Sequence, residues 1–158
     1  QLCSESILCN YPKRGYEVST ISEKEIQDIV QFRIAVECTF LMQYGPSITD
    51  ETLQKLEEHI ADHAALQANG LTALQHWTIN MRFHLLLFSS YTYTYQKLKD
   101  ALTIQTRFYA QKRSQRWQSP VFTDRDVLHQ AILDYLKQKN YTMASSILKA
   151  DIEDRSTV

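Results

Sequence analysis

The sequence contains few of the residues that break helices. Only 3 glycines and 3 prolines occur among its 158 residues, so long helices are favoured over many short strands. The sequence also has no apolar run long enough to cross a bilayer and no signal-peptide pattern at its start. We therefore expect a cytoplasmic, mostly helical protein that makes no contact with a membrane.

Neither sign of charge is in excess. The 17 basic and 18 acidic residues leave a formal net charge of −1, which gives no electrostatic footprint for nucleic acid within this stretch. The three cysteines (Cys3, Cys9 and Cys38) match no zinc-ligand spacing, so reduced thiols are the simplest interpretation. With 44% hydrophobic residues, the chain can form one domain with a real core. Its start at Gln1 instead of Met suggests a fragment of something longer.

The first twenty residues differ from the rest. Ile7-Leu8-Cys9 and Tyr16-Glu17-Val18 have the character of strands, and Pro12 and Gly15 flank two basic residues, Lys13 and Arg14, at the turn between them. This pattern predicts a short β-hairpin. An ordinary surface hairpin or a frayed terminus is the alternative interpretation.

From Ser22 onward the apolar residues recur with the period of helices. Ser22 to Glu25 forms a capping box, which predicts a helix start. Later stops and starts lie at Gly45-Pro46, Asn69-Gly70, a break at Tyr91 to Tyr95, Ser119-Pro120 and Asn140, with Thr123 to Asp126 capping the fifth helix. The pattern predicts an all-α, antiparallel bundle of about six helices.

Several polar residues occupy positions that helical spacing assigns to the core. Asn80 and His84 share a helix face with Trp77 and Leu87, and His129 shares one with Ile132, Leu133 and Leu136. Asp151 continues the series Ala144, Ile147 and Leu148. A buried carboxylate needs a partner, and a divalent cation would gather these side chains into a mixed nitrogen and oxygen site. Hydrogen-bonded core histidines and a solvated Asp151 are the alternative.

Arg33 and Glu37 are four residues apart and fall between Val30 and Phe40 on the apolar stripe of the first helix. One interpretation is a salt bridge at the edge of the stripe. The other is an Arg that faces an interior pocket, where its planar guanidinium suits a carboxylate ligand.

These segments resemble, in order and spacing, the FCD domain (the FadR C-terminal domain) of GntR-family bacterial transcriptional regulators, over nearly the whole chain. Residues 29–37 resemble its first-helix pattern, an Arg followed four residues later by a Glu. Asn80-Met81-Arg82-Phe83-His84 resembles its Asp-x-x-Phe-His motif, and Leu128-His129-Gln130-Ala131-Ile132-Leu133 resembles its later Glu-His segment. Residues 144–152 resemble its last helix, with Asp151 at the position of the final metal-binding His. Residues 1–18 resemble the wing that ends the DNA-binding winged helix of the family.

The resemblance implies an all-α bundle that dimerises, binds small organic acids and often holds a metal ion through one Asp and three His. The metal ligands would then be Asn80, His84, His129 and Asp151. Asn80 stands where the family has Asp, and Asp151 where it has His, so the set keeps one anionic ligand. The metal would be zinc, nickel or manganese, and this harder set could prefer manganese over zinc. Some family members bind effectors without metal, so loss of the metal is an alternative.

The resemblance also divides the chain by function. Residues 1–20 would be the remnant of the wing, with Lys13 and Arg14 toward operator DNA, and residues 21–158 the effector-binding and dimerisation domain. A small carboxylate-bearing effector, an organic or sugar acid, would bind the metal and Arg33 together and so modulate DNA binding by the homodimer. The chain would be a sensor and not an enzyme.

Two other functions fit parts of the sequence. His59 and His63, four residues apart with Asp62 between them, are similar to inverted zincin motifs and would suit a metal-dependent hydrolase. A solvated helix face is the alternative interpretation of that charged region. A helical adaptor that binds no ligand is the other function, and it predicts no stabilisation by any metal or metabolite.

Overall fold

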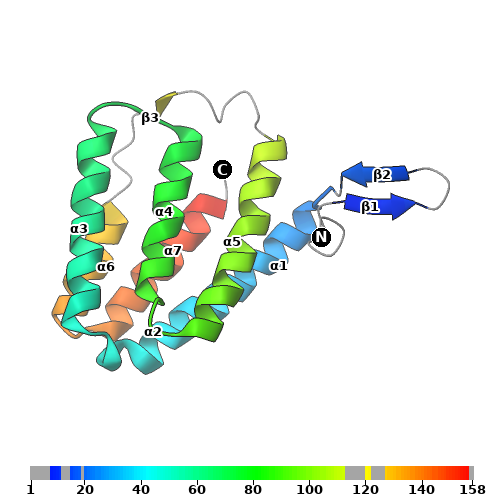
Figure 1. Cartoon of the computed structure of the whole chain (residues 1–158). Coiled ribbons are helices and arrows are strands. Elements are labelled where there is room, and N and C mark those ends of the chain that lie inside the picture. The colour runs from blue at the N-terminus through cyan, green and yellow to red at the C-terminus, as the bar shows by residue number, and fades with distance from the viewer. Residues whose placement is uncertain (1–7, 12–14, 19, 113–119, 122–126, 157–158) are drawn as a thin grey trace.

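The computed structural model describes residues 8–11, 15–18, 20–112, 120–121 and 127–156 (Figure 1). Its helices are α1 (Glu23–Arg33), the π-helical turn η1 (Ile34–Cys38), α2 (Thr39–Tyr44), the 3₁₀ turn η2 (Gly45–Ser47), α3 (Asp50–Gln67), α4 (Ala73–Leu87), α5 (Thr92–Lys112), α6 (Val127–Lys137) and α7 (Tyr141–Ser156). Because α1, η1 and α2 follow one another without a break, the α-helices form six rods. The prediction of an all-α bundle is confirmed. No helix within these ranges is long and apolar enough to span a membrane.

Two small antiparallel sheets accompany the helices. Strands β1 (Leu8–Tyr11) and β2 (Gly15–Val18) pair with Leu8 opposite Val18 and Tyr11 opposite Gly15, as the predicted hairpin requires. Strands β3 (Leu71–Thr72) and β4 (Pro120–Val121) pair across the loops that precede α4 and α6. Leu71 is therefore a strand residue, and α4 begins only at Ala73. The predicted cap at Thr123 to Asp126 lies outside the described residues.

The rods surround one core, to which each of them contributes. In Figure 1, α3, α4 and α5 stand side by side and α6 and α7 lie behind them. The first rod packs against α5 and α7. Buried apolar residues from all six rods form one continuous cluster, which includes Leu41, Leu56, Phe83, Leu102, Ile132 and Leu148.

The first rod begins at the capping box that the sequence predicts. The Ser22 hydroxyl oxygen accepts from the Glu25 amide at 3.2 Å, and Glu25 Oε2 accepts from the Ser22 amide at 2.7 Å. The π turn η1 interrupts the rod in its middle, and no prediction from the sequence included it. Arg33 and Glu37 both lie on the buried side of the rod, at the start of this turn and within it.

The joint between α6 and α7 is a tight turn that sets these two helices against each other. Lys139 has a φ of 57°, the Asn140 amide donates to the Tyr135 carbonyl at 2.8 Å and the Lys139 amide to the Leu136 carbonyl at 2.9 Å. This is a Schellman ending of α6. Asn140 Oδ1 then accepts from the Met143 amide at 3.2 Å and caps α7, as predicted.

Gly45 allows the end of the first rod to approach α7 closely. A Cβ atom at this position would lie 2.4 Å from Cδ1 and 2.9 Å from Cγ of Tyr141. We expect Gly45→Ala to lower the free energy of unfolding by about 1–3 kcal/mol, because the ring or the backbone must move. Urea unfolding of the variant measures this. Gly45→Ala in a Tyr141→Ala background is the control, and a cost that persists there would contradict the steric explanation.

Candidate metal centre

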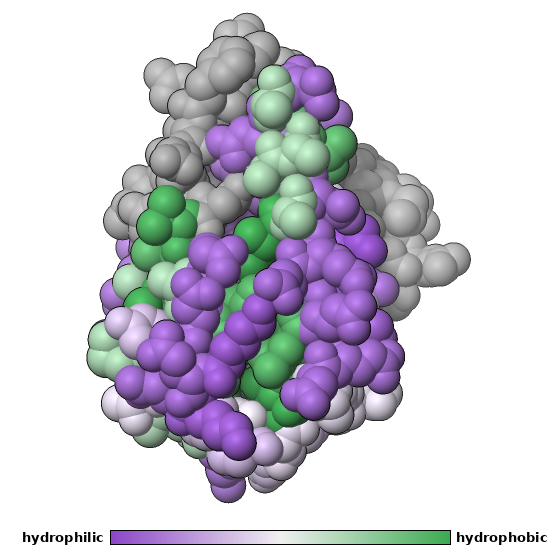
Figure 2. All heavy atoms as spheres, turned by 90° about the vertical axis from the view of Figure 1, so that its left-hand side faces the viewer, coloured by the Kyte–Doolittle hydropathy of each residue, from purple (hydrophilic) through white to green (hydrophobic). Residues whose placement is uncertain are grey.

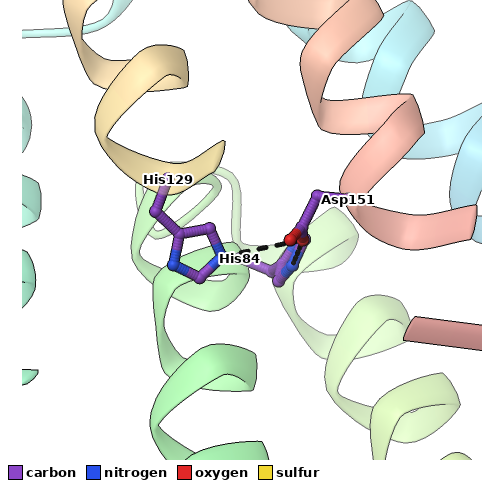
Figure 3. A group of neighbouring side chains, drawn as sticks. All are labelled: His84, His129 and Asp151. Carbon is purple, nitrogen blue, oxygen red and sulfur yellow. Dashed lines mark hydrogen bonds and ion pairs between the residues drawn. The ribbon is translucent and has the colours of Figure 1, made fainter. Parts of the chain in front are cut away.

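Three ionisable side chains from three helices meet inside the bundle (Figure 3). His84 comes from α4, His129 from α6 and Asp151 from α7, and their potential ligand atoms all lie within 4.8 Å of one another. His84 Nε2 is 3.0 Å and His129 Nε2 is 3.6 Å from Asp151 Oδ2. Relative exposure is 0%, 1% and 0% for His84, His129 and Asp151. Within the described ranges, this is the one group of three or more His, Cys, Asp or Glu side chains that could hold a metal ion.

The ring of Phe83 holds the imidazole of His129 in place. The two rings stack with their centroids 3.9 Å apart and their planes inclined by 9°. Phe83 is fully buried, so the ring of His129 rests on a rigid apolar surface. Phe83 belongs to the Asn-x-x-Phe-His motif, but the spacing of the motif does not indicate this contact.

A chain of buried polar side chains leads from the three residues to α5. His84 Nδ1 donates to Glu37 Oε2 at 2.6 Å, and Arg33 Nε donates to the other oxygen of Glu37 at 2.6 Å. Arg33 Nη1 donates to Gln105 Oε1 at 3.0 Å. All four side chains are at most 1% exposed. Arg33 therefore lies in the interior, where it forms a buried salt bridge with Glu37 and not one at the edge of the stripe. Its role toward a carboxylate ligand stays a prediction.

The sequence reasoning missed Gln105 and the contact between Glu37 and His84. Gln105 was detectable, because it occupies the buried face of α5 together with Leu98, Leu102 and Phe108. This is the same signal, a polar residue at core spacing, that pointed to His84. The pairing of Glu37 with His84 joins residues 47 positions apart, and no local spacing indicates it.

The positive and negative charges of these buried side chains balance. Both nitrogens of His84 face carboxylate oxygens, which only accept hydrogen bonds, so both nitrogens carry a proton in this arrangement. Burial opposes the charge of His84, but the negative charge of Glu37 and the hydrogen bonds to both carboxylates outweigh it and raise its pKa. Arg33 and His84 thus face two carboxylates, Glu37 and Asp151.

Both carboxylates are held in the ionised form. Burial favours protonation of Glu37, but the charges of Arg33 and His84 outweigh it and lower its pKa. Burial likewise acts on Asp151, but the imidazole of His129, 3.6 Å away, and that of His84, hydrogen-bonded at 3.0 Å, hold its pKa well below the ordinary range. The site therefore keeps its anionic ligand at neutral pH.

Asn80, the fourth predicted ligand, lies one turn before His84 on the buried face of α4 and is 0% exposed. Neither atom of its amide group, nor Nη2 of Arg33, has a hydrogen-bond partner in the part of the chain that the structure describes. Buried polar atoms are normally satisfied, so these three are free to bind a polar ligand. Two imidazole nitrogens, a carboxylate oxygen and an amide oxygen are a donor set that divalent transition metals accept. The residues present fit such an ion.

The histidines of α3 serve another purpose. His59 Nε2 lies 2.9 Å from the Ile79 carbonyl oxygen, and His63 Nε2 lies 2.7 Å from His76 Nδ1. All three imidazoles are buried, whereas Asp62 is exposed. The side of the molecule on which α3 lies is largely hydrophilic, with an apolar strip along its middle (Figure 2). The interpretation of His59 and His63 as part of a solvated face is therefore wrong. They turn to separate partners on α4, which is not the shared metal site that a hydrolase needs.

Lys13 and Arg14, predicted to contact DNA from the hairpin tip, lie outside the described residues. The hairpin strands on either side of them are present.

Comparison with known proteins identifies the family. The sequence model of the FCD domain matches residues 28–154. The chain belongs to the FCD domain family. It is an effector-binding domain of the kind found in GntR-family transcriptional regulators. No curated protein matches this FCD chain.

Solved structures share the fold of this FCD domain. McbR/YncC of E. coli has a TM-score of 0.77 at 15% identity, and the match covers 98% of this chain and 77% of that one. GntR of Streptococcus agalactiae has a TM-score of 0.65 at 18% identity over 99% and 77% of the two chains. Lar, described as controlling the agr system of Listeria monocytogenes, has a TM-score of 0.71 at 14% identity over 99% and 74%.

The balanced charges predict how the stability of the metal-free protein depends on pH. Because the pKa of His84 is raised above its ordinary value of 6.5, its contribution is present below pH 6.5 and is lost as pH rises through the raised value. We expect the free energy of unfolding in EDTA to fall between about pH 6 and pH 9, and His84→Gln to remove this fall. Urea unfolding across this range measures both.

His59 provides a control with the opposite sign. Burial lowers its pKa, so its contribution is present above pH 6.5 and is lost as pH falls through the lowered value. His59→Gln should therefore leave the alkaline fall unchanged. A fall of unchanged size in His84→Gln would contradict the role given to His84.

Proposed function

We propose that this FCD domain senses a small organic or sugar acid through a divalent metal ion and Arg33, and that binding modulates the DNA affinity of a homodimeric, cytoplasmic regulator. His84, His129 and Asp151 would hold the ion, with the amide oxygen of Asn80 as a fourth ligand. One observation carries the proposal: three ligand atoms from three helices lie within 4.8 Å of one another in a fully buried place. Zinc, nickel and manganese suit the mixed donor set.

The charges favour an effector with a single carboxylate. Metal-bound imidazoles are neutral, so a divalent ion and Arg33 would face only the two carboxylates of Glu37 and Asp151. One positive charge remains in excess, and a monocarboxylate neutralises it. Buried charge that is not neutralised is costly, so this balance selects against both uncharged ligands and dicarboxylates.

Arg33 has a donor left for such a ligand. Its Nε and Nη1 atoms are engaged by Glu37 and Gln105, and Nη2 has no partner among the described residues. An effector whose carboxylate binds the metal ion, and which accepts a hydrogen bond from Nη2 through a second oxygen, would satisfy this buried donor. A bound ion supplies positive charge and open coordination positions for that carboxylate.

The first rod offers a route from the effector to DNA. Arg33 and Glu37 lie on this rod, and four residues separate its start at Glu23 from the hairpin strand that ends at Val18. We propose that residues 1–20 are the end of a winged helix, with Lys13 and Arg14 toward operator DNA, and that residues 21–158 sense and dimerise. The effector can shift the DNA-reading arrangement only by its difference in affinity for the two states.

Metal binding tests the centre of this proposal. Wild-type protein stripped with EDTA should bind about one Zn²⁺ or Mn²⁺ ion per chain, because the ligand set forms a single site. We expect Asp151→Asn to abolish binding and Asn80→Asp to tighten it by about tenfold, because each changes the number of anionic ligands. Calorimetric titration and elemental analysis measure stoichiometry and affinity.

Asn69→Asp is the matched control for Asn80→Asp, because it adds the same charge at an exposed position of the chain. It should leave metal affinity unchanged. Wild-type protein that binds no ion would refute the metal site.

Effector binding tests the role of Arg33. A thermal-shift screen of monocarboxylic and sugar acids on metal-loaded protein should find a stabilising ligand. Arg33→Lys should weaken that ligand by about 10- to 100-fold, because lysine keeps the charge but loses the planar donor pair. Arg82→Lys, on the exposed side of α4, is the control. If neither metal nor any acid stabilises the protein, the helical adaptor becomes the better function.

A further inference from the structure

The two imidazole nitrogens of His84 face different carboxylates. Nδ1 of His84 lies 2.6 Å from Glu37 Oε2, on the side of the first rod. Nε2 lies 3.0 Å from Asp151 Oδ2, on the side where His129 also meets this carboxylate. We propose that Glu37 is a positioning residue, which keeps a proton on Nδ1 of His84 and so reserves Nε2 for the metal ion. The inference rests on the proposed metal site.

The reason lies in the chemistry of imidazole. A neutral imidazole has one proton, on either nitrogen, and binds a metal ion through the other. A carboxylate accepts hydrogen bonds but donates none when ionised, so a carboxylate beside Nδ1 fixes the tautomer and the ring orientation. Such partners also make the ligand more basic, and their loss costs metal affinity.

Glu37 is itself held from two directions. Arg33 Nε donates to its second oxygen at 2.6 Å, and Gln105 Oε1 accepts from Arg33 Nη1 at 3.0 Å. The carboxylate is 0% exposed, so water does not compete for it. Arg33 therefore has two roles, because it orients Glu37 with Nε and keeps Nη2 for an effector. Loss of Arg33 should weaken the metal site as well as effector binding.

The π turn explains how the rod keeps Glu37 directed inward. Arg33, Glu37, Leu41 and Gly45 are all buried and follow one another at four-residue steps. In an α-helix of about 3.6 residues per turn, three such steps drift by about 120° around the axis. The extra residue of the π turn reverses about 100° of this rotation around the axis. The buried residues before and after the turn therefore face the same side of the rod, and π turns of this kind are frequent at functional sites.

A purely structural role for Glu37 would be to neutralise Arg33. That role predicts that Glu37→Gln, which keeps the size of the side chain but not its charge, changes stability and leaves metal affinity unaltered. The positioning role predicts a loss of metal affinity beyond any loss of stability. The two roles therefore separate in one measurement.

The experiment compares Zn²⁺ affinity of full-length wild type and variants, by competition with a chelator after EDTA treatment. We expect Glu37→Gln to weaken Zn²⁺ binding by about 10- to 100-fold. Gln105→Leu, which removes a partner of Arg33 but leaves Glu37 in place, should weaken it less and keeps the test available if Glu37→Gln does not fold. His63→Gln, which removes a buried hydrogen bond between α3 and α4, is the control for stability and should retain wild-type affinity.

A spectroscopic readout accompanies the titration. In ¹⁵N-histidine spectra of the Zn²⁺-loaded wild type, His84 should carry its proton on Nδ1, and Glu37→Gln should lose or mix this tautomer. If Glu37→Gln keeps the wild-type Zn²⁺ affinity and tautomer, the positioning role of Glu37 is overturned, but the metal site is not. If Glu37→Gln does not fold, the same result in both Gln105→Leu and Arg33→Lys overturns it. Wild-type protein that binds no Zn²⁺ would overturn the proposed metal site and this inference with it.

Discussion

One buried line of charged and polar groups organises this domain. It runs from Gln105 through Arg33, Glu37 and His84 to Asp151, which also faces His129. Charges removed from water must be matched by opposite charges and hydrogen bonds. Here each group has at least one partner on another rod, so the match exists only when the first rod, α4, α5 and α7 are all in place. The packing of the bundle and the geometry of the site are therefore one requirement.

In the proposed function, the same line would determine what the site senses. Its members come from segments that are far apart in the chain. Nη2 of Arg33, and the amide of Asn80 one turn before His84, have no partner among the described residues. A ligand that satisfies both groups would connect α1 with α4. Because α1 follows the N-terminal hairpin after a four-residue link, the proposed effector at Arg33 would act on the hairpin through the first rod and this link.

The sequence alone was sufficient where a local period carries the information. Arg33, Asn80, His84, His129 and Asp151 were all predicted as inward-facing polar residues, and all are buried. The π turn was not predicted, because an α-helix of uniform period would rotate the positions from Arg33 to Gly45 away from one face, and no residue in the sequence marks the change of period. The links from Glu37 to His84 and from His63 to His76 join separate helices, and only the packed structure decides them.

The exchange of residues at positions 80 and 151 bears on whether the fold needs a metal ion. The family pattern that the sequence resembles has Asp and His at these positions, and this chain has Asn80 and Asp151. Asp151 lies within 3.0 Å of one imidazole and 3.6 Å of another, so protons on the histidines can satisfy it when no ion is bound. With the residues of the family pattern, Asp at position 80 and His at position 151, position 151 would carry no negative charge to neutralise protonated His84 and His129. The arrangement thus lets the bundle form without metal, so the proposed metal ion would act as a signal and not as a condition of folding.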